Sequence, residues 1–278
     1  MAPTWRKVRT YGARTLVGFG TVAAVLGVVA VIVPDSVKDQ WWLLLVCAAA
    51  GIVWALVGLF SAWPSQRYRD DRVTIRLVQG DLFAQRESAL IGMSSTFDTD
   101  VNGGIISGSS VQASFLANVY GGDVARLDAD LKTKLSPASP IDTIVKPGKT
   151  DVYPIGTVVT LASTAGVPYY CVAYTDMDCS NRAHGTISGV LRALEAVWDA
   201  ADSEGNKRSL CVPLIGQGAA RIPQFPAEVA VRIMAFSFLL RSRRSHFSKE
   251  LRIVLHPSDV DSIDLYEFQA FLKSLVPK

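Results

Sequence analysis

Three short segments contain glycine next to polar or small residues, and each could bind part of a nucleotide. The first ends in Gly80 and Asp81, directly after the alternating residues 73–79. A carboxylate just past a strand can accept a hydrogen bond from an exocyclic amine, and the neighbouring backbone amide can donate to a ring nitrogen. Gly-Asp is also a common turn signal, so an ordinary turn remains the alternative.

The second segment, residues 94–107, reads SSTFDTDVNGGIIS and is rich in hydroxyl groups. It leads into a predicted helix that starts near Ser109 and Ser110. Backbone amides at a junction between a glycine loop and a helix favour phosphate groups. The alternative is a plain loop with a helix cap, because serine is a common N-cap residue.

The third segment, residues 213–223, reads PLIGQGAARIP and follows a run typical of a buried strand. Its small residues would let backbone amides approach a diphosphate closely. No Gly-Lys-Ser/Thr follows, and the six-residue dinucleotide fingerprint is absent, so the segment is neither of those nucleotide motifs. Arg221 could contact a phosphate or simply face solvent.

Predicted strands and helices alternate along residues 73–278. This alternation favours a three-layer α/β domain with a mixed sheet, in which ligands bind beyond the carboxyl ends of strands. The predicted strands are residues 73–79, 157–161, 169–174, 209–214 and 251–255, and the predicted helices are residues 109–120, 123–135, 181–201, 226–241 and 264–275.

Taken in this order, the three segments resemble those of the macro domain, the ADP-ribose-binding module. The resemblance implies that Asp81 binds the adenine, that Leu82 contributes a backbone contact, and that two glycine loops hold the diphosphate. No cofactor other than this ADP-ribose-derived ligand is implied. The other ligand contacts predicted in this way are Asp98, Gly103, Gly104, Ile105, Ile106, Ser107, Gly216, Gln217, Gly218, Ala219, Ala220 and Arg221.

A closer resemblance rests on residues 95–99 and 104–107, on PLIGQGAARI, and on ELRIVLHPSDV at 250–260. These segments are similar to the ThsA-type macro-domain effectors of type II Thoeris anti-phage defence. That family implies a ligand, histidine-ADP-ribose, made by a TIR-domain partner enzyme. It also implies homo-oligomerisation and disruption of a membrane.

The chain departs from macro-domain hydrolases in one stretch. Those enzymes carry Asn-Ala-Ala-Asn before the first glycine loop, whereas residues 92–96 here read GMSST. The first loop also has two adjacent glycines where hydrolases usually have three. A sensor without catalytic residues is therefore expected. The alternatives are a membrane-bound hydrolase of ADP-ribose adducts and an anchor that recruits ADP-ribosylated proteins.

Two uncharged apolar runs precede this domain, at residues 16–33 and 41–63. About 20 apolar residues in a helix cross a bilayer, so the runs predict an α-helical transmembrane hairpin in contact with membrane lipid. Basic residues flank the hairpin on both outer sides, which predicts a multi-pass protein of the inner membrane with both termini cytoplasmic. A cleaved signal peptide and a buried core hairpin are the alternatives.

The predicted organisation is a basic N-terminus (1–15), the hairpin (16–63), a juxtamembrane linker (64–72) and the macro-like domain (73–278). A formal net charge of +3 is too small to indicate nucleic-acid binding. The four cysteines and three histidines are scattered, so no metal site is expected.

Overall fold

The computed structural model describes residues 20, 49, 63–218, 222–223 and 225–277. By its internal contacts the chain divides into two units, Met1–Ala62 and Trp63–Lys278. Almost all of the first unit lies outside the described residues, so the second unit is described by itself.

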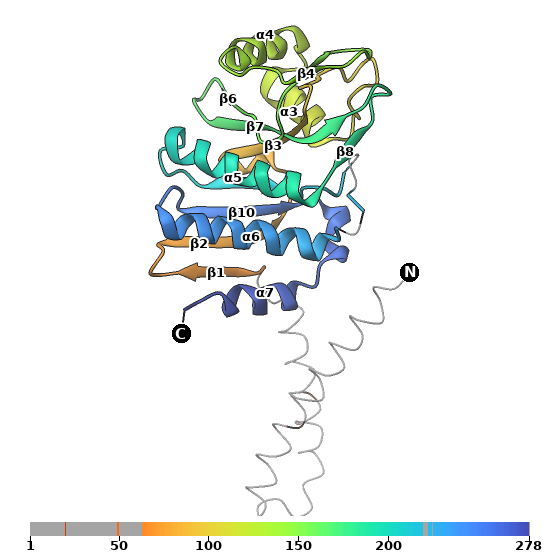
Figure 1. The fold of residues 1–278 in the computed structure, drawn as a ribbon. Helices are drawn as coiled ribbons and strands as arrows, with labels where there is room; N and C mark the ends of the chain where they lie inside the picture. Colours follow the sequence, from red (N-terminus) through yellow and green to blue (C-terminus); the bar gives the residue numbers. More distant parts are fainter. Residues whose placement is uncertain (1–19, 21–48, 50–62, 219–221, 224, 278) are drawn as a thin grey trace, which may run out of the picture. The chain divides into compact units, whose positions relative to one another are not determined.

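Strands and helices alternate along this second unit, as Figure 1 shows. In chain order they are β1 (Ser65–Tyr68), β2 (Val73–Gln79), η2 (Phe83–Gln85), β3 (Ser88–Ser94), α3 (Val111–Tyr120), α4 (Val124–Leu135), β4 (Asp142–Thr143), β5 (Asp151–Val152), β6 (Val158–Ala162), β7 (Pro168–Met177), β8 (Ala183–Gly185), α5 (Ile187–Glu204), β9 (Leu210–Pro213), α6 (Ala227–Arg244), β10 (Glu250–Leu255), η3 (Pro257–Ser262) and α7 (Leu265–Ser274).

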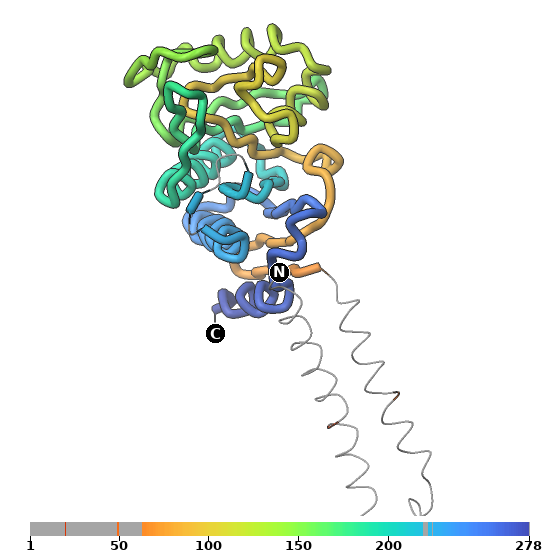
Figure 2. Tube along the Cα trace, turned by 90° about the vertical axis from the view of Figure 1, so that its right-hand side faces the viewer, coloured from red at the N-terminus to blue at the C-terminus, as the bar shows by residue number. Residues whose placement is uncertain are grey.

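The main sheet has the strand order β1-β2-β10-β9-β3-β7-β6, and β8 pairs with β7. The five strands from β2 to β7 in this order run parallel, whereas β1, β6 and β8 are antiparallel to their neighbours. The predicted mixed sheet is therefore confirmed. The tube in Figure 2 follows the same strands from the side.

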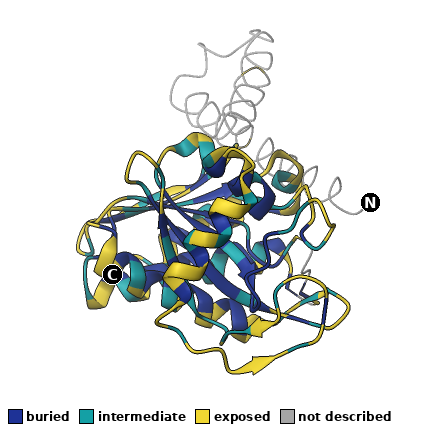
Figure 3. Ribbon diagram, turned by 90° about the horizontal axis from the view of Figure 1, so that it is seen from above, coloured by how far each residue is buried: buried dark blue, intermediate teal, exposed yellow. Residues whose placement is uncertain are grey.

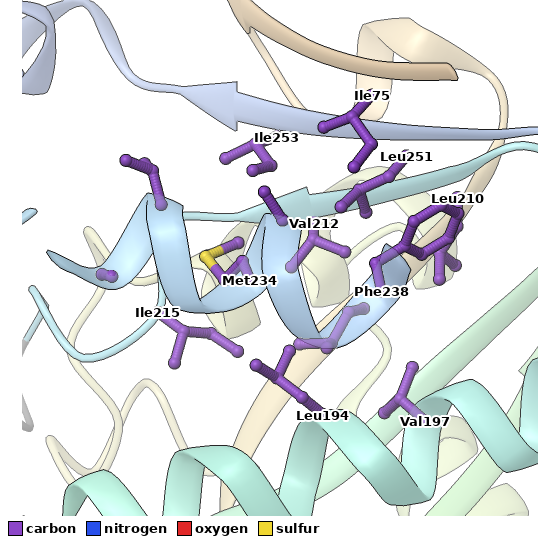
Figure 4. Packing of buried hydrophobic residues seen from close by; sticks show 14 of the residues in the cluster. Ile75, Leu194, Val197, Leu210, Val212, Ile215, Met234, Phe238, Leu251 and Ile253 are labelled. Atoms are coloured by element: carbon purple, nitrogen blue, oxygen red, sulfur yellow. The ribbon is translucent and has the colours of Figure 1, made fainter. Parts of the chain in front are cut away.

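Side chains alternate between two cores on the two faces of this sheet. In β10, Leu251 and Ile253 point into a core shared with α5 and α6, whereas Val254 points into a core shared with α3 and α4. Figure 4 shows Met234 and Phe238 of α6 packed against the first set. Because strand side chains alternate, one sheet can bury both faces between helices. The predicted α/β class is thus confirmed for this unit.

Helices α3, α4, α5 and α7 begin at side-chain caps, whereas α6 follows Pro226 without one. The Thr186 hydroxyl accepts a hydrogen bond from the Gly189 amide at 3.0 Å, which satisfies one free donor at the start of α5. Val190, Leu194 and Val197 then recur at three- and four-residue spacing and are all fully buried. In Figure 3 the buried residues lie between the layers and the exposed residues lie on the outer faces of the helices.

Two local predictions differ from the structure, and one strand was missed. Residues 64–72 do not form a mere linker, because β1 lies there and the Tyr68 hydroxyl donates to the Leu272 carbonyl oxygen at 2.8 Å. The predicted helix 181–201 begins only at Ile187, since residues 183–185 pair with β7 as β8. Strand β3 was not predicted, because it is buried on both faces and so lacks a clear alternation.

The predicted localisation also needs correction. Within the described residues, every helix is too short or too polar to cross a bilayer. This finding does not fit a multi-pass protein of the inner membrane with cytoplasmic termini, and that prediction is not retained. The apolar runs on which it rested, 16–33 and 41–63, lie outside the described residues apart from Gly20, Ala49 and Trp63.

Candidate functional site

The two predicted glycine loops leave the sheet side by side. Strands β3 and β9 are neighbours and run parallel, so the loops that follow them emerge at the same carboxyl edge. Asp81 follows β2, which lies three strand spacings, or about 14 Å, from β3 at the same edge. This arrangement suits an extended ligand, with one end near Asp81 and its middle between the loops.

Asp81 is exposed at the end of β2. Its Oδ1 accepts a hydrogen bond from the Phe83 amide at 2.9 Å, so a short turn fixes the carboxyl group. Leu82, in contrast, is buried in the α3–α4 core, which leaves only its backbone for a ligand contact. Asp81 also lines a cavity of about 360 Å³, together with Phe83, Ala84, Arg86, Asn118, Val119 and Tyr169.

The first glycine loop is held by its own turn. Asp100 accepts the Gly103 amide at Oδ1 (2.7 Å) and the Ile106 amide at its backbone oxygen (2.9 Å). Gly104 has a φ of +78°, which favours glycine, and a Cβ at position 103 would overlap Asp100 Oδ2, so the carboxyl group that accepts the Gly103 amide would have to move. Gly103, Gly104 and Ser107 are exposed, Ile105 is half-buried, and the Ile106 side chain is buried.

Asp98 faces the protein interior. Its carboxylate accepts hydrogen bonds from the Thr96 hydroxyl, from Lys146 Nζ at 2.7 Å and from the Lys149 amide at 2.8 Å. The side chains of Asp98 and Lys146 are 1% and 0% exposed. The Asp98 carboxylate oxygens are therefore directed to partners inside the fold, which leaves the backbone of this residue for the predicted ligand contact.

The second glycine loop folds back on the residues that lead into α6. Gly216 has a φ of +79°, and its carbonyl oxygen accepts the Ile222 amide at 3.1 Å. The Gln217 side-chain amide donates to the Phe225 carbonyl oxygen, so this side chain supports the loop. Gly218 is exposed, and a Cβ there would meet nothing within 4 Å. The predicted contacts Ala219, Ala220 and Arg221 lie outside the described residues.

Sequence analysis missed Lys146 and Lys149, which lie in the connection between β4 and β5. Lys149 Nζ donates to the Phe97 carbonyl oxygen at 2.8 Å and pairs with Asp128 at 2.6 Å. Residues 146–149 are about fifty positions from the loop that they contact. Neither periodicity nor a motif marks such a pairing in a single sequence.

The stretch that carries the catalytic Asn in macro-domain hydrolases is turned inward here. Ser94, Ser95 and Thr96 are all buried. The Ser94 and Thr96 hydroxyls lie 3.2 Å apart, and Ser95 Oγ accepts the Met177 amide at 3.3 Å. These hydroxyls therefore contribute to the fold and are not presented to a ligand.

His184 and His256 have local partners. His184 Nε2 lies 2.9 Å from Asp178 Oδ2 in the turn before β8, and this hydrogen bond lowers the pKa of Asp178. His256 Nδ1 lies 2.8 Å from the Ser258 hydroxyl at the start of η3. Across the part of the chain that the structure describes, no three metal-ligating side chains cluster.

Solved structures with a similar fold include macrodomains. The Oceanobacillus iheyensis macrodomain with ADP has a TM-score of 0.51 and 13% sequence identity, over 77% of this chain and 98% of that one. A mutant of the same macrodomain with ADPR has a TM-score of 0.51 and 13% sequence identity, over 76% of this chain and 98% of that one. At this identity the likeness shows the fold alone. No curated protein matches the chain.

The family comparison covers more than half of the chain. The family model described as "Thoeris protein ThsA, Macro domain" matches residues 75–256, which include Asp81 and both glycine loops. The chain therefore belongs to the ThsA macro-domain family.

Proposed function

We propose that this chain is a sensor that binds an ADP-ribose-derived small molecule along the carboxyl edge of its sheet. The adenine would lie at Asp81 and the backbone of Leu82. The diphosphate would lie between the two glycine loops, against residues 103–107 and 216–221. The observation that carries the proposal is the emergence of both loops from the neighbouring parallel strands β3 and β9.

The finer identity of the ligand is proposed from the family. Its members imply histidine-ADP-ribose, made by a TIR-domain enzyme that would be the functional partner. Binding without turnover is supported by the inward-facing hydroxyls of Ser94, Ser95 and Thr96. The membrane disruption that the family also implies would depend on residues 16–63, nearly all of which lie outside the described residues.

We further propose that the sensor associates with a second copy of itself through α6. Val229, Phe236 and Leu240 are 37%, 45% and 43% exposed, and their spacing of seven and four residues places them on one helix face. A two-fold axis across α6 would bring this same apolar stripe of two antiparallel copies together, since an isologous interface uses one self-complementary patch.

Calorimetric titration of the 278-residue chain with ADP-ribose and with histidine-ADP-ribose tests the ligand. The expected result is saturable binding, tighter for the adduct, with both ligands recovered intact by chromatography. Release of ADP-ribose from the adduct would instead favour the hydrolase. Failure to bind either ligand would contradict the sensor.

A further inference from the structure

We propose that the turn at residues 146–149, acting through Asp98, is a positioning element that sets the shape of the first glycine loop. Its effect would be on affinity for the diphosphate part of the ligand, so the inference rests on the proposed function. None of the residues in this turn was predicted to contact a ligand.

The first support is a fully buried ion pair. Lys146 Nζ lies 2.7 Å from Asp98 Oδ2, and neither side chain has more than 1% of its surface exposed. Removing two charges from water is costly, and the cost is offset only where the geometry is good and the remaining acceptors are satisfied. Here the Thr96 hydroxyl and the Lys149 amide complete the shell of the carboxylate. Asp98 is therefore held firmly between β3 and the glycines.

The second support is direct contact with the rest of the loop. Lys149 Nζ donates to the Phe97 carbonyl oxygen at 2.8 Å, which holds the start of the loop. Gly148 lies against its middle, because a Cβ there would stand 2.5 Å from Asp98 Oδ1 and 2.6 Å from Ile105 Cδ1. The turn thus supports the loop on both sides of Asp98.

The connection to α4 adds a fixed base for this support. Lys149 Nζ pairs with Asp128 Oδ1 of α4 at 2.6 Å, and the Thr99 hydroxyl donates to the same oxygen. Val145, just outside the turn, is 92% exposed. One side of the turn therefore meets solvent, while the other meets the loop against which the diphosphate would lie. The amides of Gly103, Gly104 and Ile106 already donate within this loop, so a phosphate would meet the amides of Ile105 and Ser107. Hydrogen bonds depend steeply on angle and distance, so a small displacement of those two amides weakens their contact with phosphate.

A pair of glycine substitutions tests this inference. Gly148→Ala places a methyl group against Ile105 and Asp98, at a φ of +87°. Gly166→Ala, in the turn between β6 and β7, is the matched control, since its φ is +71° and nothing lies within 4 Å of its Cβ. Both carry the same kind of backbone strain, but only the first pushes the loop.

Two measurements on the 278-residue chain are compared: the Kd for ADP-ribose and the amide hydrogen exchange of residues 103–107 without ligand. Gly148→Ala is expected to raise the Kd about 10-fold or more, which is a loss of one decade in affinity, and to speed exchange in the loop. Gly166→Ala is expected to leave the Kd within about 2-fold of wild type. Lys146→Met, which removes the buried charge, is expected to act in the same direction as Gly148→Ala.

The possible outcomes distinguish failure of the positioning role from failure of the proposed sensor function. If the wild-type chain binds ADP-ribose and Gly148→Ala binds it with the same Kd, the positioning role is wrong and the proposed sensor function is unaffected. An equal loss in Gly148→Ala and Gly166→Ala would overturn it as well, because general strain would then explain both. If the wild-type chain bound neither ADP-ribose nor its histidine adduct, the sensor and the inference would fail together.

Discussion

The Asp81 carboxylate has two oxygens with different tasks. Oδ1 accepts the Phe83 amide and holds the turn after β2, while Oδ2 is the oxygen that an exocyclic amine would reach. The side chain is exposed and lines a cavity with the rings of Phe83 and Tyr169, whose centroids lie 6.4 Å apart. Tyr169 lies at the amino end of β7, so this cavity extends away from the glycine loops, and the proposed adenine contact rests on Asp81 itself.

Substitution of Asp81 separates these two tasks. Asp81→Asn keeps an oxygen for the Phe83 amide but replaces the second acceptor by a donor. The affinity for ADP-ribose is expected to fall about 10- to 100-fold, the usual value of a hydrogen bond to a charged group. Asp81→Ala should lose at least as much, because it removes the turn contact too. Calorimetry that shows wild-type affinity for Asp81→Asn would remove the adenine contact from the proposal.

Asp100 places a negative charge at the loop against which the diphosphate would lie. Its Oδ1 accepts the Gly103 amide at 2.7 Å, so an anionic ligand approaches a carboxylate already at the loop. Asp100→Asn keeps the acceptor oxygen but removes the repulsion. ADP-ribose is expected to bind about 3- to 10-fold more tightly to this variant. The gain is this small because charges near a surface interact through a high effective dielectric.

Salt provides the control for the Asp100 prediction. Mobile ions screen exposed charges beyond about 10 Å at 0.1 M, so the gain in affinity should shrink as the salt concentration rises. Titrations at low and high salt compare the two proteins directly. A gain that is independent of salt would point to altered loop shape in place of charge.

At the scale of elements, strands β7 and β9 carry thiol and phenol groups whose pKa values are raised by burial. Burial raises the pKa of the Cys211 thiol in β9 from 9.0 to about 12, and it raises the pKa of Cys171 in β7 as well. Burial likewise raises the pKa values of Tyr170 and Tyr174 in β7 from 10.0 to about 12. In the unfolded chain these groups would ionise near their ordinary values.

The sign of the pH dependence follows from this difference. A pKa raised in the folded state means that the unfolded state loses its proton first, so folding loses stability as pH rises. Stability should be complete below about pH 9 and should fall between about pH 9 and 12. Urea unfolding at pH 7.5 and pH 10.5 measures the effect. Equal free energies of unfolding at the two pH values would contradict the assigned burial of these groups.

A subset of the elements followed from sequence pattern alone. The alternation of residues 73–79 predicted β2, and the apolar spacing of residues 123–135 predicted α4. Both elements leave a pattern because one face is buried and the other faces solvent. β3 carries no such contrast, since both of its faces are buried. β1 was missed because its short, mostly polar sequence has no clear strand pattern, and the strand is fixed by pairing with β2.

The candidate site was predictable to the same extent. Glycine and aspartate after a strand, and glycine before a helix, mark loops whose backbone is locally determined, and those segments do emerge at one sheet edge. The inward orientation of Asp98 was not predictable, because it depends on Lys146, which lies 48 residues away in the sequence. A contact of that range leaves no local signal in one sequence.

At the scale of the whole unit, the candidate site and the outer helix layer are joined by a short path. The second glycine loop runs into α6, and the Gln217 side chain holds the Phe225 carbonyl oxygen just before that helix starts. A ligand bound at this loop would therefore also act on the segment that leads into α6. Ligand binding can shift association only through a difference in affinity between the free and associated forms, and this connection offers a route for that difference.

The last prediction concerns association through the exposed face of α6. Phe236→Glu places a charge in the middle of the apolar stripe, opposite its own copy in an antiparallel pair, where like charges repel. Because Phe236 is on the outer surface of the helix, the variant should still fold and should bind ADP-ribose within about 2-fold of wild type. Sedimentation velocity should show less ligand-induced association than in the wild-type chain.

Val145→Glu is the matched control for this variant. It adds the same charge at a side chain that is 92% exposed in the β4–β5 connection, away from α6. Association of Val145→Glu should match that of wild type at equal concentration. If Phe236→Glu also associates like wild type when ligand is bound, the two-fold contact through α6 is wrong, and any self-association of the chain must use another surface.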